Sequence, residues 1–344
     1  MTLPLWIVVF VVSLAVLIKA SDVFTGAAEK LGLLLGIPPF IIGVTIVALG
    51  TSLPELVSSI IAASAGAPEI VVGNVVGSNV TNIFLVLGVA AVLSKEIRID
   101  YSFLHLDLAF LMGVTTLMAV TCWDGTFTRW EALACVLGMA LHVAYNVKLD
   151  HGPTETSEEA NESLQAELTE AVAPVGDGFW GTEGTEGPTT ESEAEAEVGW
   201  KLTMVLLFSS LFIYGGARYT VESVIALADI LGVGKEIVAV TAVALGTSLP
   251  ELSVTISAAR KGKAELAVGN VLGSNIFNTL YVMGLPALLV PLPIPSSLLG
   301  FGLPAMLIAT GLFVAFTIDR RVSRWEGVVL IGCYVAFLMG IFLR

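Results

Sequence analysis

Charged residues are scarce in this 344-residue chain. They make up 13% of it, whereas a soluble domain of ordinary composition has about a quarter. Hydrophobic residues make up 56%, and the mean hydropathy is +0.88. Apolar runs of about 20 residues recur along the whole chain, and each is long enough to cross a hydrocarbon core of roughly 30 Å. The composition excludes an ordinary soluble domain and predicts a polytopic membrane protein.

Cysteine and histidine are equally rare, with three of each. Cys122, Cys135 and Cys333 fall in or at the ends of apolar runs and lack metal-ligand spacing, so we interpret them as packed thiols. His105 and His142 stand alone in apolar runs, where packing or interfacial roles are commoner than ligation. These residues therefore predict neither a disulfide framework nor a zinc site.

The apolar runs predict an all-α protein with ten transmembrane helices, five in each half of the chain. No basic residue precedes the first run and Lys19 follows it, so we interpret this run as a retained span rather than a signal peptide. The predicted spans are 3–20, 36–64, 69–93, 102–122, 129–148, 200–217, 235–259, 264–290, 297–318 and 325–343.

A polar segment separates the two halves, so the predicted organisation is 1–149, a linker over 150–198, and 199–344. From Asp150 to Glu197 the chain has fourteen acidic residues and no Lys or Arg, which equals the net charge of −14. Such a segment buries too little apolar surface to offset chain entropy, so we expect it to be disordered. Two interpretations stay open: a solvated tether, or a regulatory loop that senses calcium or a partner.

Basic residues predict the orientation in the membrane. When the chain start is labelled outside, the inside loops hold twelve of the 16 Lys and Arg residues and the outside holds four. This positive-inside bias places both termini outside and the acidic linker in the cytoplasm. We expect an integral protein of the cell (plasma) membrane.

Two motifs occur twice, 196 residues apart. Residues 43–55 read GVTIVALGTSLPE and residues 239–251 read AVTAVALGTSLPE. Residues 73–82 read GNVVGSNVTN and residues 269–278 read GNVLGSNIFN. Five predicted spans separate each motif from its copy, so the copies enter the membrane from opposite sides. Inverted-topology repeats of this kind are typical of secondary transporters that bind substrate near the bilayer midplane.

The first motif should bend or break its helix. Pro54 removes a backbone donor and collides with the carbonyl of Gly50, and the break frees carbonyl oxygens around Ala48. In a bilayer, such groups must be satisfied by protein, water or an ion. Hydroxyls and a carboxylate follow at Thr51, Ser52 and Glu55, and the copy supplies Ala244, Thr247, Ser248 and Glu251.

The second motif adds further oxygen ligands. Ser78 and Asn82 are four residues apart and share a helix face, as do Ser274 and Asn278 in the copy. Gly73 and its neighbour four residues on permit close helix packing. Oxygen-only ligation suits hard cations such as Ca²⁺, Na⁺, Mg²⁺ or Mn²⁺ and disfavours Zn²⁺ and copper.

Structural roles explain other polar residues in or near the spans. We expect Asn74, Asn79, Asn270 and Asn275 to form hydrogen bonds between helices. Glu69 and Glu265 lie at predicted helix starts, where the helix dipole favours a carboxylate. Loop edges or amphipathic linkers account for Asp107, Glu131, Glu222 and Asp229. For Glu55 and Glu251 the structural alternative is a buried ion pair, but neither motif contains Lys or Arg, so we favour ion binding.

The paired GTSLPE and GNxxGSN motifs resemble the two alpha repeats of the sodium/calcium exchanger family, within the calcium/cation antiporters. The resemblance implies a ten-helix exchanger with four cation sites midway through the membrane. It implies that Glu55 and Glu251 are the principal Ca²⁺ ligands. Further ligands for Ca²⁺ and Na⁺ would be Thr51, Ser52, Thr247, Ser248, the carbonyls of Ala48 and Ala244, and Ser78, Asn82 and Ser274.

One position departs from the family pattern. The family often has Asp where this chain has Asn278, so two carboxylates remain instead of three. Two negative charges match two Na⁺, two H⁺ or one Ca²⁺ without excess. We therefore hypothesise a cycle that is less electrogenic than the exchange of three Na⁺ for one Ca²⁺.

The sequence thus predicts a non-enzymatic Ca²⁺/Na⁺ antiporter that works by alternating access, with no cofactor. Its partners would be inorganic cations and the lipid bilayer, with no nucleic acid, and we expect a functional monomer. Three alternatives stay open: an H⁺-coupled Ca²⁺ exchanger on the same fold, a Ca²⁺-permeable channel, and a membrane scaffold that recruits partners through the acidic linker. K⁺ involvement is also open.

Overall fold

The chain is mostly helical. A computed structural model describes residues 3–34, 39–64, 66–94, 96–99, 104–149, 191–231 and 248–343. The first half contains α1 (Leu3–Leu34), α2 (Pro39–Ile42), η1 (Gly43–Val47), α3 (Ala48–Thr51), α4 (Leu53–Ser64), α5 (Glu69–Thr81), η2 (Asn82–Leu87), α6 (Gly88–Ser94), β1 (Glu96–Arg98), α7 (Leu104–Thr121), β2 (Thr126–Phe127) and α8 (Arg129–Leu149). The second half contains α10 (Glu191–Leu231), α13 (Leu249–Arg260), α14 (Ala264–Phe277), η4 (Asn278–Val282), α15 (Met283–Leu289), β3 (Leu292–Pro293), η5 (Leu298–Gly302), α16 (Leu303–Thr317), β4 (Arg321–Ser323) and α17 (Arg324–Phe342). The η segments are π-helical.

Among the described residues, seven helices are long and apolar enough to cross a membrane. An eighth span is the bent pair Phe40–Thr51 and Leu53–Ser64. The predicted span 129–148 is a single helix, α8, but it is not one of these seven. The predicted span 235–259 is described only from residue 248 onward. Residues 150–190 of the predicted linker lie outside the described residues.

Two helices extend well beyond the spans predicted for them. α1 has 32 residues and continues past Lys19 to Leu34, and its continuation packs against the bundle, where Ser21, Phe24 and Ala28 are buried. α10 has 41 residues, so residues 191–198, which the sequence analysis assigned to the linker, are helical. Asp and Glu end an apolar run without ending a helix, since Glu is a good helix former.

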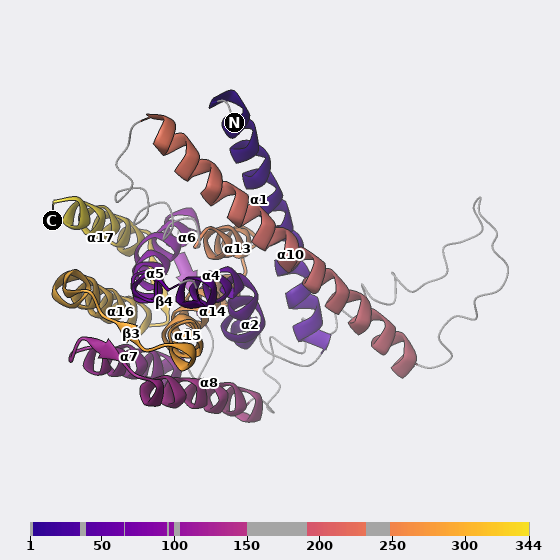
Figure 1. The fold of residues 1–344 in the computed structure, drawn as a ribbon. Coiled ribbons are helices and arrows are strands. Elements are labelled where there is room, and N and C mark those ends of the chain that lie inside the picture. The colour runs from indigo at the N-terminus through magenta and orange to yellow at the C-terminus, as the bar shows by residue number, and fades with distance from the viewer. Residues whose placement is uncertain are drawn as a thin grey trace.

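α1 and α10 cross each other at one side of the bundle (Figure 1). At the crossing, a Cβ added to Gly216 would lie 3.0 Å from the backbone of Leu17, so the absence of a side chain at Gly216 lets the helices approach closely. The remaining helices form the bundle beside this pair, and α4, α5 and α14 lie inside it (Figure 1).

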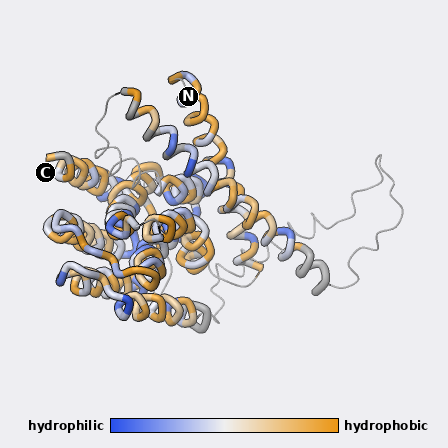
Figure 2. Tube along the Cα trace, viewed as in Figure 1, coloured by the Kyte–Doolittle hydropathy of each residue, from blue (hydrophilic) through white to orange (hydrophobic). Residues whose placement is uncertain are grey.

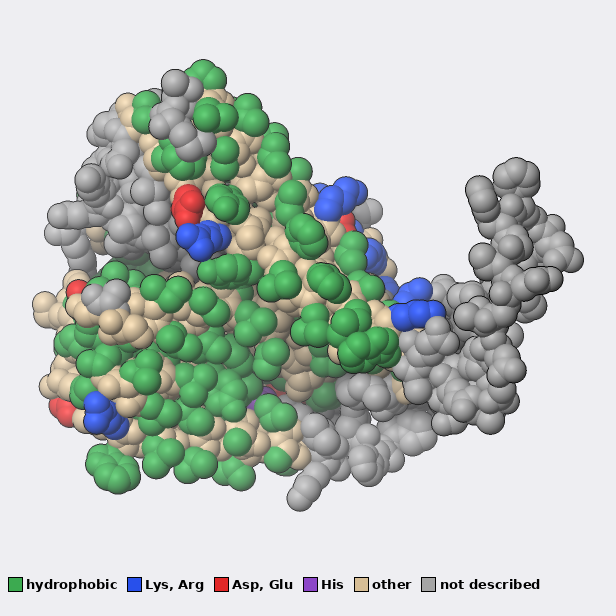
Figure 3. Space-filling view, turned by 45° about the vertical axis from the view of Figure 1, so that its right-hand side comes forward, with side chains coloured by type: hydrophobic (Ala, Val, Ile, Leu, Met, Phe, Trp, Pro, Cys, Tyr) green, Lys and Arg blue, Asp and Glu red, His purple; other side chains and the backbone are tan. Residues whose placement is uncertain are grey.

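The outside of the bundle is apolar and its centre holds polar groups. Hydrophobic residues predominate along the helices (Figure 2) and cover most of the face in Figure 3. In the spans Glu69–Ser94 and Ala264–Leu289, 83% of an 18-residue apolar stretch is buried inside the bundle. In Leu3–Gly32 the buried share of such a stretch is 12%. This arrangement suits a protein surrounded by lipid, because the outer helices need no water-facing side.

Short antiparallel strands join the two halves outside the spans. β1 pairs with β4, with Ile97 opposite Val322, and β2 pairs with β3, with Phe127 opposite Leu292. Both pairs connect sequence positions more than 160 residues apart. They therefore tie loops of the first half to loops of the second.

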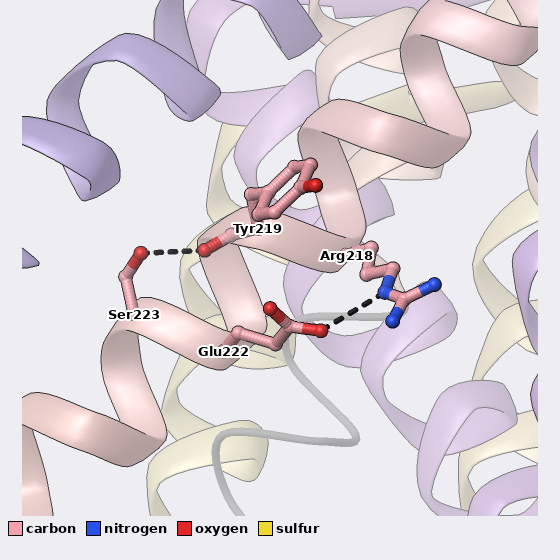
Figure 4. Close-up of polar contacts among 4 residues, drawn as sticks. All are labelled: Arg218, Tyr219, Glu222 and Ser223. Atoms are coloured by element: carbon pink, nitrogen blue, oxygen red, sulfur yellow. Dashed lines mark hydrogen bonds and ion pairs between the residues drawn. The ribbon is translucent and has the colours of Figure 1, made fainter.

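Three of the isolated charged residues have defined environments. Glu131 caps the start of α8, where its Oε2 accepts a hydrogen bond of 2.6 Å from Thr128 N, so the prediction of a loop-edge role is confirmed. Glu222 lies on the partly exposed side of α10 and accepts a hydrogen bond of 2.9 Å from Arg218 Nε (Figure 4). The interpretation of Asp107 was wrong: it is 2% exposed, in the first turn of α7.

The three cysteines and His142 behave as packing residues. Cys122 and Cys135 are buried and Cys333 is partly buried, and all three are free thiols. His142 is buried and stacks on Phe110 with ring centroids 4.4 Å apart. His105 is exposed in the first turn of α7.

Candidate functional site

The first motif breaks its helix where the sequence predicts. α3 ends at Thr51, α4 begins at Leu53, and the two parts are bent by 41°. Ser52, between them, has φ −88° and ψ 5°. Ser248 in the copy has almost the same backbone, with φ −84° and ψ 5°. The identical sequence therefore produces the same local geometry twice.

The helices that follow also repeat. α4 and α13 have 12 residues each, and 196 positions separate their first residues. π-Helical segments begin at Asn82 and at Asn278, again 196 positions apart. A π-helical turn inserts an extra residue and is frequent at functional sites.

Glycines bring the broken helix of the first motif against α14. A Cβ on Gly273 would lie 2.3 Å from Val44 O and 2.7 Å from Ala48 Cβ. A Cβ on Gly269 would lie 2.5 Å from Phe40 O. These distances are too short for any side chain, so the close crossing requires glycine. Among the described residues, a Cβ on Gly73 would meet only Leu298, at 4.0 Å; the counterparts of the residues that contact Gly269 lie outside the described part of the chain.

This crossing brings predicted ligands of the two halves together. Ser52 Oγ donates a hydrogen bond of 2.8 Å to Glu251 Oε1. Thr51 Oγ1 lies 3.5 Å from Ser274 Oγ, and both hydroxyls also interact with the Glu251 carboxylate. All these side chains are fully buried. Residues some 200 positions apart thus share one polar cluster inside the bundle.

Glu55 lies in the first turn of α4 with no exposed surface. Its backbone carbonyl accepts a hydrogen bond of 3.4 Å from Asn74 Nδ2. The same nitrogen lies 3.0 Å from Ser59 Oγ, one turn further along α4. Asn74 therefore ties α5 to the helix that carries Glu55.

The second motif lines up buried polar groups on α5, η2, α14 and η4. Ser78, Asn82, Ser274 and Asn278 are each fully buried. The side-chain amide atoms of Asn82 and Asn278, Ser248 Oγ and Glu251 Oε2 make no hydrogen bond in the part of the chain that the structure describes. Buried polar atoms without hydrogen bonds are rare and unfavourable. The oxygens among these atoms are therefore available to bind a cation, whereas the amide nitrogens can only donate to water or another acceptor.

The predicted helix-to-helix role is confirmed for Asn74, Asn79 and Asn270. It was wrong for Asn275, whose Nδ2 donates to Val271 O in the preceding turn of its own helix at 2.7 Å. Asn79 Nδ2 donates to Thr279 Oγ1 at 2.8 Å and to Asn275 O at 3.3 Å. Asn270 Nδ2 donates to Thr255 Oγ1 at 2.9 Å. Glu69 and Glu265 lie in the first turns of α5 and α14, as predicted.

Two of the predicted site residues, Ala244 and Thr247, lie outside the described residues. In the first copy, Ala48 is buried and its carbonyl accepts from Ser52 N at 3.0 Å and from Thr51 Oγ1 at 3.3 Å. This carbonyl is therefore shared between the backbone of the bend and a predicted ligand.

Sequence reasoning missed two contacts that α1 makes with the helices that carry the cluster. The Phe24 ring fills the space beside Gly50, where an added Cβ would lie 2.1 Å from Phe24 Cζ. Asp22 Oδ1 accepts a hydrogen bond of 2.6 Å from Ser257 Oγ on α13. The signal for Asp22 was its carboxylate in an otherwise apolar run, but neither residue belongs to a repeated motif.

Comparison with known proteins gives a consistent result. A family model described as "Sodium/calcium exchanger protein" matches residues 5–148 and 201–343. The sodium/calcium exchanger MaX1 of Methanosarcina acetivorans is 35% identical, with 97% of each chain covered. The inner membrane protein YrbG of Escherichia coli is 32% identical, with 95% of this chain and 94% of the relative covered.

A solved structure has a similar fold. A structure of the sodium-calcium exchanger NCX_Mj soaked with 10 mM Na⁺ and zero Ca²⁺ matches with a TM-score of 0.77 and 25% sequence identity. The match covers 97% of this chain and 98% of that one. The similarity therefore extends over both halves.

Proposed function

The chain belongs to the sodium/calcium exchanger family, and on this premise we propose that it exchanges Ca²⁺ for Na⁺ across the membrane by alternating access. It is an integral membrane cation exchanger. The cations would bind at one site between the two halves. Its ligands would be Glu55, Glu251, Thr51, Ser52, Thr247, Ser248, Ser78, Asn82, Ser274, Asn278 and the carbonyls of Ala48 and Ala244.

The observation that carries this proposal is the polar cluster around Glu251. It joins Ser52 of the first copy to Glu251 of the second at 2.8 Å, in a fully buried position. Glu251 Oε2 in this cluster makes no hydrogen bond among the described residues, and neither do the buried side-chain oxygens of Asn82 and Asn278. The cluster's polar atoms are mainly oxygens, which suit hard cations.

Inverted five-helix repeats, 1–149 and 199–344, are the arrangement we propose for the two halves. The nearly equal backbone angles at Ser52 and Ser248 support it, as do the π-helical segments that begin at Asn82 and Asn278. The excess of inside Lys and Arg supports termini outside and an acidic cytoplasmic linker over 150–198. We propose that the protein acts as a monomer in the cell membrane.

Charge explains why such a site would exchange ions rather than leak them. An empty site leaves two carboxylates in a medium of low dielectric, at a penalty of several kcal/mol per ion even after relaxation. The filled site is close to neutral, so the barrier to switching sides falls only when cations are bound. The contacts of Phe24 and Asp22 with Gly50 and Ser257 support α1, with α10, as the moving gate.

Radiolabelled Ca²⁺ uptake into reconstituted vesicles tests the function. We expect an outward Na⁺ gradient to drive uptake with pH and K⁺ clamped on both sides. Uptake that follows only a pH gradient would instead assign an H⁺-coupled exchanger on the same fold. Downhill Ca²⁺ flux that needs no counter-ion would assign a channel, and a requirement for a K⁺ gradient would add K⁺ to the transported ions.

The stoichiometry gives a second prediction. Because Asn278 leaves two carboxylates, we expect a cycle that moves less net charge than the exchange of three Na⁺ for one Ca²⁺. The measurement is charge moved per Ca²⁺ in proteoliposomes with a clamped membrane potential. One net charge per Ca²⁺ would contradict it, whereas introducing a third carboxylate with Asn278→Asp should raise the charge moved per cycle.

A further inference from the structure

We propose that Asn270 is a positioning residue for cation binding. Its Oδ1 accepts the hydroxyl proton of Thr51, and this turns the lone pairs of the Thr51 oxygen toward the cation. The inference rests on the proposed function and adds to it a residue outside the ligand set. The sequence alone predicts only an interhelical hydrogen bond for Asn270.

Asn270 links three helical segments from a fully buried position on α14. Its Nδ2 donates to Thr255 Oγ1 on α13 at 2.9 Å. Its Oδ1 accepts from Thr51 Oγ1 on α3 at 3.2 Å. One end of the amide is therefore anchored to the helix that carries Glu251, and the other end holds a ligand from the opposite half of the chain.

The orientation of this amide follows from its counterpart in the first copy. Asn74 Nδ2 lies 3.0 Å from Ser59 Oγ and 3.4 Å from the backbone carbonyl of Glu55. A carbonyl can only accept, so the amide nitrogen of Asn74 must face α4. Ser59 and Thr255 occupy equivalent positions, 196 residues apart, and each faces an asparagine nitrogen. The same orientation places Oδ1 of Asn270 toward Thr51.

Thr51 has one hydroxyl proton and four neighbours that can accept it, one of which is the Glu251 carboxylate. Asn270 Oδ1 lies at 3.2 Å, Ala48 O at 3.3 Å and Ser274 Oγ at 3.5 Å. A hydroxyl that binds a cation must present its lone pairs to the ion and send its proton elsewhere. The Ala48 carbonyl, the Ser274 hydroxyl and the Glu251 carboxylate are themselves proposed ligands, so all three need their lone pairs for the cation. Asn270 Oδ1 is the acceptor that remains.

A double-mutant cycle tests this coupling. The variants are Asn270→Leu, which keeps the side-chain size without hydrogen bonds, Thr51→Val, and the two combined, all measured by equilibrium ⁴⁵Ca²⁺ binding to purified protein. We expect Asn270→Leu to weaken Ca²⁺ affinity roughly tenfold, which corresponds to the loss of one buried hydrogen bond. In the Thr51→Val background the same change should have almost no further effect, because the group that Asn270 positions is gone.

The matched control is Asn79→Leu. Asn79 is also a buried asparagine that joins two helices, through Thr279 and the backbone of Asn275, but it contacts none of the proposed ligands among the described residues. We expect this variant to be less stable to heat and to bind Ca²⁺ with unchanged affinity. A purely structural role for Asn270 would make the two variants alike.

A milder variant covers the case in which Asn270→Leu does not fold. Thr255→Val removes only the anchor of the amide nitrogen, so Ca²⁺ affinity should fall severalfold, and Thr255→Ser should restore it. Unchanged affinity in folded Asn270→Leu or Thr255→Val, or additive effects in the cycle, would overturn the inference while leaving wild-type exchange intact. A wild-type protein that binds neither Ca²⁺ nor Na⁺ would overturn the proposed function itself.

Discussion

Replacing either Glu55 or Glu251 by glutamine is expected to abolish Ca²⁺ transport and leave the protein folded. Both side chains are fully buried, and glutamine has almost the same shape. Losing one of two carboxylates leaves a divalent ion uncompensated in low dielectric, so we expect transport to fall roughly a hundredfold or more. The measurement is ⁴⁵Ca²⁺ uptake by vesicles that contain equal amounts of monodisperse protein.

Glu69→Gln is the matched control for these variants. Glu69 is an exposed glutamate in the first turn of α5, where it favours the helix dipole and contacts none of the proposed ligands among the described residues. Its uptake rate should stay within about twofold of wild type, because surface dipole interactions amount to less than about 1 kcal/mol. Near-normal uptake by both Glu55→Gln and Glu251→Gln would remove these residues from the site.

The second large effect is expected from Gly273→Val. A single Cβ at this position would already lie 2.3 Å from Val44 O and 2.7 Å from Ala48 Cβ. Because the obstacle is backbone rather than the end of a flexible side chain, α14 and the broken helix must move apart. Overpacking of this kind typically reduces stability by about 1–3 kcal/mol, and by more where backbone must shift. The thermal unfolding midpoint in detergent should fall, and Ca²⁺ uptake should be lost.

Gly113→Ala provides the comparison for Gly273→Val. Gly113 lies in the middle of α7, and a Cβ there would meet no atom within 4 Å. Alanine has the higher helix propensity, so this variant should unfold at the wild-type temperature or slightly above it. A Gly273→Val protein with wild-type stability and uptake would show that the crossing tolerates separation.

The bend and the buried polar residues at the centre of the bundle were predictable, because they depend on residues close together in the sequence. The bend at Ser52 follows from Gly50 and Pro54, since proline removes a backbone hydrogen bond wherever the helix lies. The buried state of Glu55 and Glu251 follows from their apolar surroundings in the sequence. The helix-to-helix hydrogen bonds of Asn79 and Asn270 follow from the scarcity of other partners in a membrane.

Features that depend on tertiary packing were not predictable. A charged side chain ends an apolar run whether or not it ends a helix, so the length of α1 beyond Lys19 was missed. Burial of Asp107 depends on which side of α7 faces the bundle. The contact of Asp22 with Ser257 joins residues 235 positions apart, and neither position carries a repeated motif that would have paired them.

The length of α10 has a mechanical consequence. Its 41 residues span about 61 Å at 1.5 Å per residue, roughly twice the hydrocarbon thickness. The crossing with α1 at Gly216 lies 25 residues from Glu191, a lever arm of about 38 Å. A tilt of α10 by about 10° about that crossing would move its end at Glu191 by roughly 6–7 Å. A small tilt at the gate therefore becomes a large displacement within the acidic stretch.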